Sequence, residues 1–457
     1  MNLVHNIHYY YIPKFVRNIM LILVRNNFDA FLVGGCIRDD FLKRPCNDYD
    51  IVTDAKPWEI KKCFESNSLY KVSTYDTDHG TIQITNSVLS KYIIEITPYR
   101  DHSRNLKEDL KHRDFTINAI ACDYIGFVKD PQNGIHDLTN RIIRCCGDSK
   151  ERFVEDPLRI LRAIRFASLL KFDIEYNTKF NMFHWCFELK SIPKERIFDE
   201  LCKILLSDNC SKLLLDYKYI IYTIIPEFKK CVDFNQNNPN HNLDVYDHMI
   251  TSIDKYESKQ ESYESDLCIK IALFLHDIGK PECYTEDENE VGHFYNHAEK
   301  SEEIARRILL NLHCPNKWIE HITTLIKYHD YEIGENKKSV NKIISKIGFN
   351  MVKELLEVKK ADIKAQSQKF AEYKLENISS IEHILDNINE DYSNKKVVFG
   401  LKDLIINGND LLNIGIPQGP KIGKLLNLLL NTIIEGNINN TYDDCINFVL
   451  HNLDKID

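Results

Sequence analysis

Two aspartates spaced two residues apart, Asp48 and Asp50, have the type and spacing that metal-dependent chemistry requires. Residues two apart on a β-strand point to the same face, so the two carboxylates are expected side by side. Carboxylate oxygens suit Mg²⁺, which commonly shares its coordination sphere with substrate phosphates. Two such ions can activate an attacking hydroxyl and stabilise a leaving pyrophosphate. The pair therefore predicts a two-magnesium phosphoryl-transfer site; the alternative for an isolated Asp-x-Asp is a solvated turn.

The segments around the aspartates add groups suited to phosphate. Gly34 and Gly35 allow the backbone to approach a phosphate closely and begin a helix whose first amides favour anions. Arg38 lies one turn into that helix. Glu95 falls in an apolar run, where an unpaired carboxylate would be costly. It is either a third acid of the catalytic metal site or a salt-bridged strand residue, and the sequence favours neither.

Helices and strands of a mixed head must position these groups. Hydrophobic periodicity predicts a helix over 13–26 that leads into a strand over 30–33. Alternating β-branched residues predict two further strands, over 81–85 and 92–97. From about Glu155 onward almost every segment has helical period. The predicted fold class is α+β, with a mixed sheet and its helices followed by an all-α region.

The length and composition of the chain limit its class. At 457 residues it is expected to form several domains. A hydrophobic content of 43% and a charged content of 28% are typical of a soluble globular protein. The net charge of −9 argues against indiscriminate coating of nucleic acid but is compatible with a local basic groove. Fourteen cysteines without a CxxC pair or a secretory signal predict a cytoplasmic setting, and the apolar run over 19–24 is too short to span a membrane.

Three further segments follow the aspartates in order. They are Arg113-Asp-Phe-Thr-Ile-Asn118, Asp130-Pro-Gln-Asn-Gly-Ile-His-Asp-Leu138 and Arg152-Phe-Val-Glu-Asp-Pro-Leu-Arg-Ile-Leu-Arg-Ala-Ile-Arg-Phe166. In order and spacing, residues 30–205 resemble the class II tRNA nucleotidyltransferases, the family that adds CCA to tRNA 3′ ends and includes bacterial poly(A) polymerases. The resemblance implies transfer of nucleotides from CTP to tRNA without a nucleic-acid template, with ATP left open as a second substrate.

The resemblance assigns roles to residues of the head. Asp48 and Asp50 would hold two Mg²⁺ ions. Asp114 and Asn118 would help to hold the sugar and phosphates. Contacts with the incoming nucleotide are implied for Gly34, Gly35, Arg38 and Arg113. A histidine, His112, stands where the family usually has the first arginine of a pair, so no role follows for that position.

The segment after Glu155 has the chemistry to select a base. Asp156 is a natural N-cap and Pro157 suits the first helical position, after which positions 156, 159 and 162 share one helix face. A carboxylate and a guanidinium can pair with the amine and ring nitrogen of cytosine or adenine, whereas uracil presents a carbonyl to the acid. The resemblance implies that Asp156 and Arg159 select the base and that Arg162 touches the nucleotide. The alternative is a capped helix with a ladder of surface arginines.

The connection between Arg100 and Asp109 is short. Only eight residues separate them, whereas about twenty are usual in the family, well beyond a typical connection. In the family this loop is the lever that refits the pocket from CTP to ATP, and members that add only two C residues have it shortened. A CC-adding member is therefore one hypothesis; the other is a CCA-adding enzyme whose lever lies elsewhere.

Histidines and aspartates recur in the helical half. His276 and Asp277 lie in an apolar helix, where a charged pair needs a reason. With His248 and Asp362 in the same order, they resemble an HD domain, in which two His and two Asp bind a divalent metal and commonly hydrolyse phosphoesters. Additional polar positions of that family match His297 and His329. Imidazole and carboxylate suit several divalent transition metals, so the ion and any hydrolytic activity stay open.

Four domains are predicted from these features. They are a nucleotidyltransferase head over 1–145, a helical neck with base recognition over 146–232, an HD metal-binding domain over 233–375 and a helical tRNA-binding tail over 376–457. In the neck, the i,i+4 spacing of Arg196 and Glu200 predicts an ion pair that braces a helix. The glycine-bounded helix starts and lysines of the tail resemble the part of bacterial members that grips the tRNA elbow, and they also suit an ordinary helix-turn-helix connection.

The predicted function is addition of C, with A left open, to the tRNA 3′ end. The expected partners are tRNA and CTP, with ATP left open as a second substrate. No membrane and no obligate protein partner are expected. Three alternatives are kept: a poly(A) polymerase of the same family, an HD-type phosphohydrolase as the main activity, and a tRNA-binding protein without catalysis. The last is the weakest, because both sets of metal-binding residue types are complete.

Overall fold

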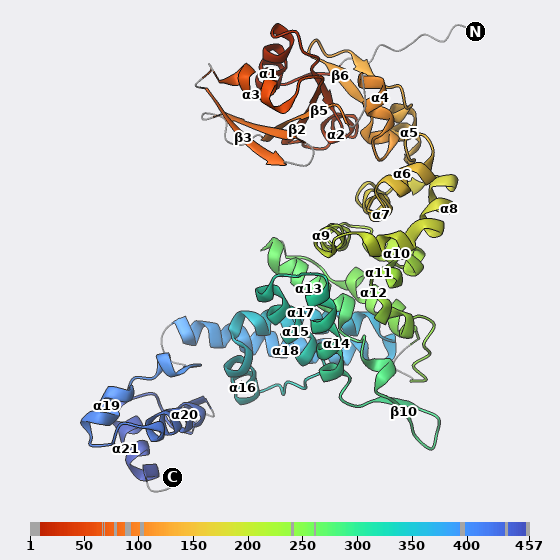
Figure 1. Ribbon diagram of the computed structural model, residues 1–457. Helices are drawn as coiled ribbons and strands as arrows, with labels where there is room; N and C mark the ends of the chain where they lie inside the picture. The colour runs from red at the N-terminus through yellow and green to blue at the C-terminus, as the bar shows by residue number, and fades with distance from the viewer. Residues whose placement is uncertain are drawn as a thin grey trace. The chain divides into compact units, whose positions relative to one another are not determined.

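The computed structural model describes residues 10–65, 67, 69–76, 80–86, 93–100, 105–238, 242–259, 262–393, 398–434 and 437–453. The chain divides into two compact units, Met1–Asn209 and Cys210–Asp457. The large sheet belongs to the first unit, in red and orange in Figure 1, and helices dominate the second. Within the described ranges, no helix combines the length and the apolar character needed to cross a membrane.

A mixed sheet forms the centre of the first unit. Its strand order is β3-β4-β5-β2-β1-β6-β7, in which β2 and β5 are parallel and the other neighbours antiparallel. The strands are β1 (Phe31–Val33), β2 (Asp48–Thr53), β3 (Tyr70–Asp76), β4 (Thr81–Asn86), β5 (Ile93–Pro98), β6 (Ala121–Asp123) and β7 (Val128–Lys129). The three predicted strands correspond to β1, β4 and β5, with Tyr92 outside the described residues. β6 and β7 are too short to give a periodic signal.

The register of the sheet separates polar from core side chains. Asp50 of β2 is aligned with Glu95 of β5. Residues aligned across neighbouring strands share a face, so these two carboxylates project from the same side. Tyr49 and Ile51, which alternate with the aspartates, are buried on the other face. The β2 backbone therefore provides the side-by-side placement that the spacing of Asp48 and Asp50 predicts.

Helices cover both faces of this sheet. Those of the first unit are α1 (Lys14–Arg25), α2 (Gly35–Phe41), α3 (Pro57–Phe64), α4 (Leu106–Lys111), α5 (Gly134–Asn140), α6 (Ser149–Glu155), α7 (Arg159–Leu170), α8 (Tyr176–Trp185) and α9 (Lys194–Leu205). α1, which agrees with the predicted helix, lies on the Tyr49 face, because Phe15 meets Tyr49 edge to face at 5.6 Å. α4 lies on the Asp50 face, where Leu106 and Leu110 pack against β1 and β2. The short strands β8 (Ile142–Ile143) and β9 (Asp173–Ile174) pair beside α7.

The second unit is predominantly helical, as the sequence predicts. Its helices are α10 (Cys210–Asp216), α11 (Lys218–Ile224), α12 (Val245–Lys255), α13 (Tyr263–Leu275), α14 (His297–Asn311), α15 (Asn316–Tyr328), α16 (Lys337–Ile347), α17 (Phe349–Ala365), α18 (Gln368–Ser393), α19 (Gly408–Asn413), α20 (Pro420–Ile434) and α21 (Tyr442–Asn452). A hairpin of β10 (Tyr284–Glu286) and β11 (Gly292–Phe294) interrupts them. The α+β fold class is confirmed.

Packing in the second unit has more than one centre. α13 is buried along most of its length and packs against α12, α15 and α17. Leucines of α19 and α20 form a separate core, which includes Leu411, Leu425 and Leu429. The first of these centres matters for function, because α12, α13 and α17 each carry or end at a residue of the predicted HD set.

Candidate active site and candidate metal centre

Three carboxylates lie on one face of the head sheet. Asp48 is exposed and Asp50 half-buried on β2, and Glu95 stands beside Asp50 on β5. Burial raises the pKa of Asp50; Arg113 opposes this shift, whereas the neighbouring Asp48 adds to it. Acids that repel one another in a partly buried site suit a divalent cation, because the cation lowers the cost of ionising them.

Gly34 brings the backbone against these acids. Its φ of 82° lies in the left-handed region, which favours glycine. A β-carbon built there would stand 3.4 Å from Nη1 of Arg113 and 3.5 Å from Oδ2 of Asp50. The Gly34 turn therefore lies beside both Asp50, a candidate catalytic residue, and Arg113, a candidate nucleotide-binding residue.

Arg38 of α2 is buried and already has partners. Its guanidinium donates to both carboxylate oxygens of Asp39, at 2.9 Å each, and to Oδ1 of Asn118 at 2.7 Å. A β-carbon on Gly35 would stand 3.5 Å from Nη2 of Arg38, so this arginine lies directly under the turn. Sequence reasoning missed Asp39. The available signal was an acid next to a predicted functional arginine in a helix with a buried face.

Arg113 is held from the other side of the site. Its Nε donates to Oδ2 of the buried Asp109 at 3.3 Å, and Oδ1 of Asp109 accepts the backbone N–H of Arg100 at 3.0 Å. Burial lowers the pKa of Arg100 to about 10, and Arg113 adds to this effect. The two ends of the short connection are therefore tied together through Asp109. Of the connection itself, residues 101–104 lie outside the described residues.

Asp114 and Asn118 connect the arginines to one another. Asp114 Oδ2 accepts from Nε and Nη2 of Arg162 at 3.0 and 2.5 Å, while its Oδ1 accepts from Nδ2 of Asn118 at 3.1 Å. Burial alone would raise the pKa of Asp114, but Arg162 and Asn118 hold it well below its usual range. Both residues are buried, so they act first as internal ties between head and neck helices.

The base-recognition segment departs from its predicted local structure. α7 begins at Arg159, two residues later than Pro157, although Asp156 Oδ1 still accepts the N–H of Leu158 at 3.2 Å. The ion pair predicted between Arg196 and Glu200 is wrong. Arg196 donates to Asp156 Oδ2 at 3.2 Å instead. In the same neck, the partner of Glu200 at 2.7 Å is Nε of Arg165. Helical spacing permits an i,i+4 pair between Arg196 and Glu200. In the structure each of the two residues pairs instead with a residue outside α9.

Arg159 is buried against residues of α6 and of the head. Its guanidinium donates to Oε2 of Glu155 at 2.9 Å and to the carbonyl of His112 at 3.0 Å. Nδ1 of His112 lies 3.1 Å from Oε1 of the same glutamate. Hydrogen bonds from His112 and nearby arginines outweigh partial burial and lower the pKa of Glu155. Glu155 is thus a second residue that sequence reasoning missed as part of the site, even though it adjoins Asp156.

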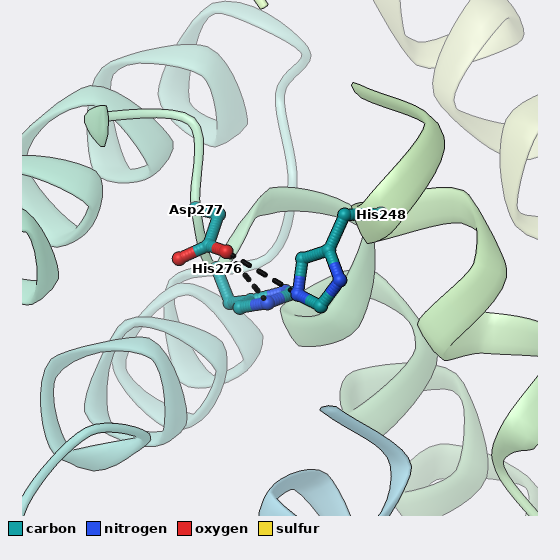
Figure 2. Close-up of side chains that lie close together, drawn as sticks. All are labelled: His248, His276 and Asp277. Carbon is teal, nitrogen blue, oxygen red and sulfur yellow. Dashed lines mark ion pairs between the residues drawn. The ribbon is translucent and has the colours of Figure 1, made fainter. Parts of the chain in front are cut away.

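The predicted HD residues converge in the second unit. His248 comes from α12, His276 and Asp277 follow the end of α13, and Asp362 comes from α17. Nε2 of His248 lies 2.9 Å from Oδ1 of Asp362 and 3.4 Å from Oδ2 of Asp277. Figure 2 shows the imidazoles of His248 and His276 turned toward the Asp277 carboxylate. Residues 114 positions apart in the chain are brought together here.

The two oxygens of Asp277 face different histidine pairs. Oδ2 lies 3.4 Å from Nε2 of His248 and 3.3 Å from Nε2 of His276. Oδ1 lies 3.4 Å from Nε2 of His297 and 3.5 Å from Nε2 of His329. Asp277 is therefore shared by two groups of ligand atoms, each within 4.8 Å, and the two outlying histidines belong to the same cluster.

The histidines are oriented for coordination. Nδ1 of His276, His297 and His329 each lies within hydrogen-bonding distance of a carbonyl three residues earlier, at 2.8, 2.8 and 2.6 Å. A bond from that nitrogen fixes the ring and leaves Nε2 free to bind a metal. Nε2 of His276 and Oδ1 of Asp277 are buried without a hydrogen-bond partner. Buried polar atoms rarely lack a partner, so this donor set fits a divalent metal.

Lys280 completes the surroundings of Asp277. Its Nζ lies 2.7 Å from Oδ2 of Asp277 and is almost fully buried. Burial opposes ionisation of Asp277, but Lys280 and His276 hold its pKa well below its usual range. Burial also opposes protonation of His276, yet Asp277 and Asp362 raise the pKa of that imidazole to about 10. Sequence reasoning missed Lys280; a lysine three residues after a buried acid on an apolar helix was the available signal.

Three protein-family models match the chain. "Poly A polymerase head domain" matches residues 30–144, "Probable RNA and SrmB- binding site of polymerase A" matches 171–231, and "tRNA nucleotidyltransferase domain 2 putative" matches 285–449. Together they cover the head, much of the neck and most of the second unit.

Known proteins agree with these matches. The CCA-adding enzyme of Streptococcus thermophilus is 27% identical over 96% of this chain and 98% of that protein. The CCA-adding enzyme of Enterococcus faecalis is 41% identical, with 40% of this chain and 46% of that protein aligned, so at this higher identity the chain matches about half of its relative. The Bacillus stearothermophilus CCA-adding enzyme in complex with CTP has the same fold, with a TM-score of 0.70, 21% identity, and 97% of this chain and 99% of that one covered.

The mixed-sheet head and the helical second unit together have the fold of solved CCA-adding enzymes. The family-model matches and the Streptococcus thermophilus relative, which aligns over almost its whole length, identify the class of protein more narrowly. The chain therefore contains segments that match the poly(A) polymerase head and tRNA nucleotidyltransferase domain families and is similar to CCA-adding enzymes along nearly its whole length, consistent with a class II tRNA nucleotidyltransferase.

Proposed function

We propose that this protein adds C residues to the 3′ end of tRNA. Addition of a terminal A is left open. The observation that carries the proposal is the convergence of Asp50, which shares its strand with Asp48, with the Gly34 turn and Arg113. Relatives named CCA-adding enzymes, and a Thermotoga maritima CCA-adding enzyme solved with tRNA that is 21% identical with a TM-score of 0.59, support it. Within this family a poly(A) polymerase is the alternative.

The head residues suit in-line transfer of a nucleotide. Asp48, Asp50 and Glu95 offer carboxylate oxygens for Mg²⁺, which when bound would lower the pKa of the attacking hydroxyl and neutralise the leaving pyrophosphate. Because Gly34 has no side chain, its backbone comes close to Asp50 and Arg113, where the triphosphate would bind. Arg113 lies at the same turn and offers a guanidinium to the triphosphate. The tRNA 3′ hydroxyl would lose its proton and form a bond to the α-phosphate, while the bond between the α-phosphate and the departing pyrophosphate breaks.

Base selection is proposed for the segment between α6 and α7. Asp156 would accept the exocyclic amine of cytosine or adenine, and Arg159 would donate to the ring nitrogen. Asp156 is 29% exposed at its side chain, whereas Arg159 is 10% exposed and bound to Glu155. The arginine is therefore fixed before the base arrives, which reduces the entropy cost of recognition. Arg162 would contact the nucleotide while anchored on Asp114.

The number of residues added is decided by an assay. The tie between Arg100 and Asp109 closes a connection that is short for the family, and this supports addition of two C residues. Purified protein is incubated with tRNA ending at the discriminator base, CTP and ATP, and products are read to one residue. Products that stop after two C residues support a CC-adding enzyme. Efficient addition of a terminal A contradicts it, and failure to extend tRNA at all contradicts the proposed function.

A second activity, hydrolysis of a phosphoester, is proposed for the helical half as an HD domain. Nε2 of His276 and Oδ1 of Asp277, which are buried without hydrogen-bond partners, favour the metal that this activity would need. Asp277 with His248 and His276, and again with His297 and His329, would hold one or two divalent transition metal ions. The test is metal content of the purified protein by mass spectrometry, followed by hydrolysis of a 2′,3′-cyclic nucleotide. Protein that binds no transition metal at micromolar concentration contradicts the metal site.

The remaining proposals concern organisation and location. A head over 1–145, neck over 146–232, HD domain over 233–375 and tRNA-binding tail over 376–457 would divide these tasks. A cytoplasmic location is supported by the fourteen cysteines, all of which are free thiols. Limited proteolysis with mass mapping of the stable fragments tests the boundaries.

A further inference from the structure

One aromatic ring contacts three guanidinium groups in the first unit. Phe166 of α7 is 5% exposed. The Cζ atoms of Arg38, Arg162 and Arg165 lie 5.0, 5.6 and 4.1 Å from its ring centroid. A cation within about 6 Å of a ring face is attracted by the ring quadrupole, most strongly where water is excluded. The proposed mechanism gives this ring no role.

Phe166 also closes a loop of contacts. Arg38 donates to Asn118, Asn118 donates to Asp114, and Asp114 accepts from Arg162. Arg38 and Arg162 thus meet twice, once through this hydrogen-bonded chain and once over the ring. Arg38 belongs to the helix that starts at the glycine turn, whereas Arg162 belongs to the helix that follows the base-recognition segment. The loop therefore couples the proposed phosphate end of the nucleotide site to its base end.

The three guanidinium groups around Phe166 are each paired with a carboxylate. Three guanidinium groups around one ring repel one another, and each has a carboxylate partner: Asp39 for Arg38, Asp114 for Arg162 and Glu200 for Arg165. These carboxylates come from three different segments, so they fix each arginine separately. The ring touches all three arginines and fixes their spacing relative to one another.

We infer that Phe166 is a positioning residue for nucleotide binding, holding Arg38 and Arg162 at the separation that the bound nucleotide requires. The inference rests on the proposed nucleotidyltransferase function. Loss of the ring face should let the two arginines relax independently. Affinity for the nucleotide should then fall, whereas affinity for tRNA should not, because the ring of Phe166 is buried against these arginines and the edge of Phe115, away from the surface that an RNA could touch.

The test uses the full-length protein and steady-state kinetics with CTP and tRNA. Phe166→Leu and Phe166→Met remove the ring but keep an apolar side chain, and Phe166→Tyr keeps the ring. Phe64→Leu is the matched control, since Phe64 is also buried in the first unit but packs edge to face on Tyr70, away from the arginines. We expect the leucine and methionine variants to raise the KM for CTP about tenfold, with the KM for tRNA unchanged and Phe166→Tyr within about twofold of wild type.

Three outcomes would overturn the inference. One is a KM for CTP in Phe166→Leu and Phe166→Met no higher than in Phe64→Leu; another is an equal rise for CTP and tRNA; the third is a rise in Phe166→Tyr as large as in Phe166→Leu. The two non-aromatic variants keep the test available if one of them fails to fold. Wild-type protein that adds no nucleotide would instead contradict the proposed function, so the two failures are distinguishable.

Discussion

The head and the helical half both gather acids for a metal, but they do so differently. In the helical half, buried imidazole and carboxylate atoms form two groups that share Asp277, and within each group the ligand atoms lie within 4.8 Å of one another. Within the described part of the chain, the three head carboxylates form no such group. One cluster is a preformed cage, and the other is an open row of acids on a sheet face.

This difference follows from the chemistry of the proposed ions. Mg²⁺ is usually bound by one or two carboxylates together with substrate phosphates, so a site for it stays incomplete until the nucleotide arrives. A transition metal held by histidines can be bound by the protein alone. The proposed magnesium site of the head would therefore be completed only by its substrate, whereas the proposed metal site of the helical half would need no substrate.

The largest effect is expected from the head acids. Asp50→Ala should reduce nucleotide addition about 10³-fold or more, because metal coordination supplies several kcal/mol of transition-state stabilisation. tRNA binding and the metal content of the helical half should not change. Single-turnover extension of tRNA measures the loss. The control is Asp199→Asn, an exposed acid on α9 paired with Lys203. Retention of transfer within about tenfold of wild type contradicts the role of Asp50.

Asp277→Asn should have the converse effect. We expect loss of bound transition metal and of any hydrolytic activity, with nucleotide addition unchanged. In metal-free protein the buried Lys280 loses its charged partner, which should cost about 3 kcal/mol of unfolding free energy, measured by chemical denaturation. Asp287→Asn is the matched control, since Asp287 pairs with His293 on the exposed hairpin. If nucleotide addition fails in Asp277→Asn, the two sites are not independent.

Asp156→Asn should change specificity more than rate. An amide can accept from an amine or donate to a carbonyl, so discrimination between CTP and UTP should fall about tenfold. The ratio of kcat/KM for the two nucleotides measures it. Asp148→Asn is the control, because Asp148 also accepts a backbone N–H, that of Lys150 at 2.9 Å, but at the start of α6. If discrimination between CTP and UTP is unchanged, Asp156 does not select the base, and its role is limited to accepting hydrogen bonds from Leu158 and Arg196.

The smallest effect concerns stability and pH. The folded-state pKa of Asp50 is raised, chiefly by burial, so folding favours its protonated form. That contribution is complete below the unfolded pKa and is lost as pH rises through the folded pKa. In protein treated with a chelator, Asp50→Asn should therefore raise the denaturation midpoint at about pH 7 and leave it unchanged at about pH 3. A lower midpoint at neutral pH would show that the ionised carboxylate stabilises the fold.

Local pattern accounts for much of what was predicted. Alternation along β2 predicts that Asp48 and Asp50 share one face. That Glu95 lies on the same face follows only from the parallel pairing of β2 with β5. Helical period after Glu155 predicts the α+β class, and the order of the head motifs predicts the family. These features are encoded in short stretches of sequence, which is why periodicity and spacing reveal them.

Partner choice was settled only by tertiary structure. By spacing alone Arg196 pairs with Glu200, yet each found a partner on another segment, Asp156 and Arg165.

The sequence by itself determined which residue types lie on which strand face or helix, and these led to the family resemblance and to the prediction of two metal sites. Only the tertiary structure decided that Asp277 is shared by two histidine pairs and that Phe166 meets three arginines. The physical reason is that strand and helix periods act over a few residues. Contacts between buried charges depend instead on distances between segments that are far apart in the chain.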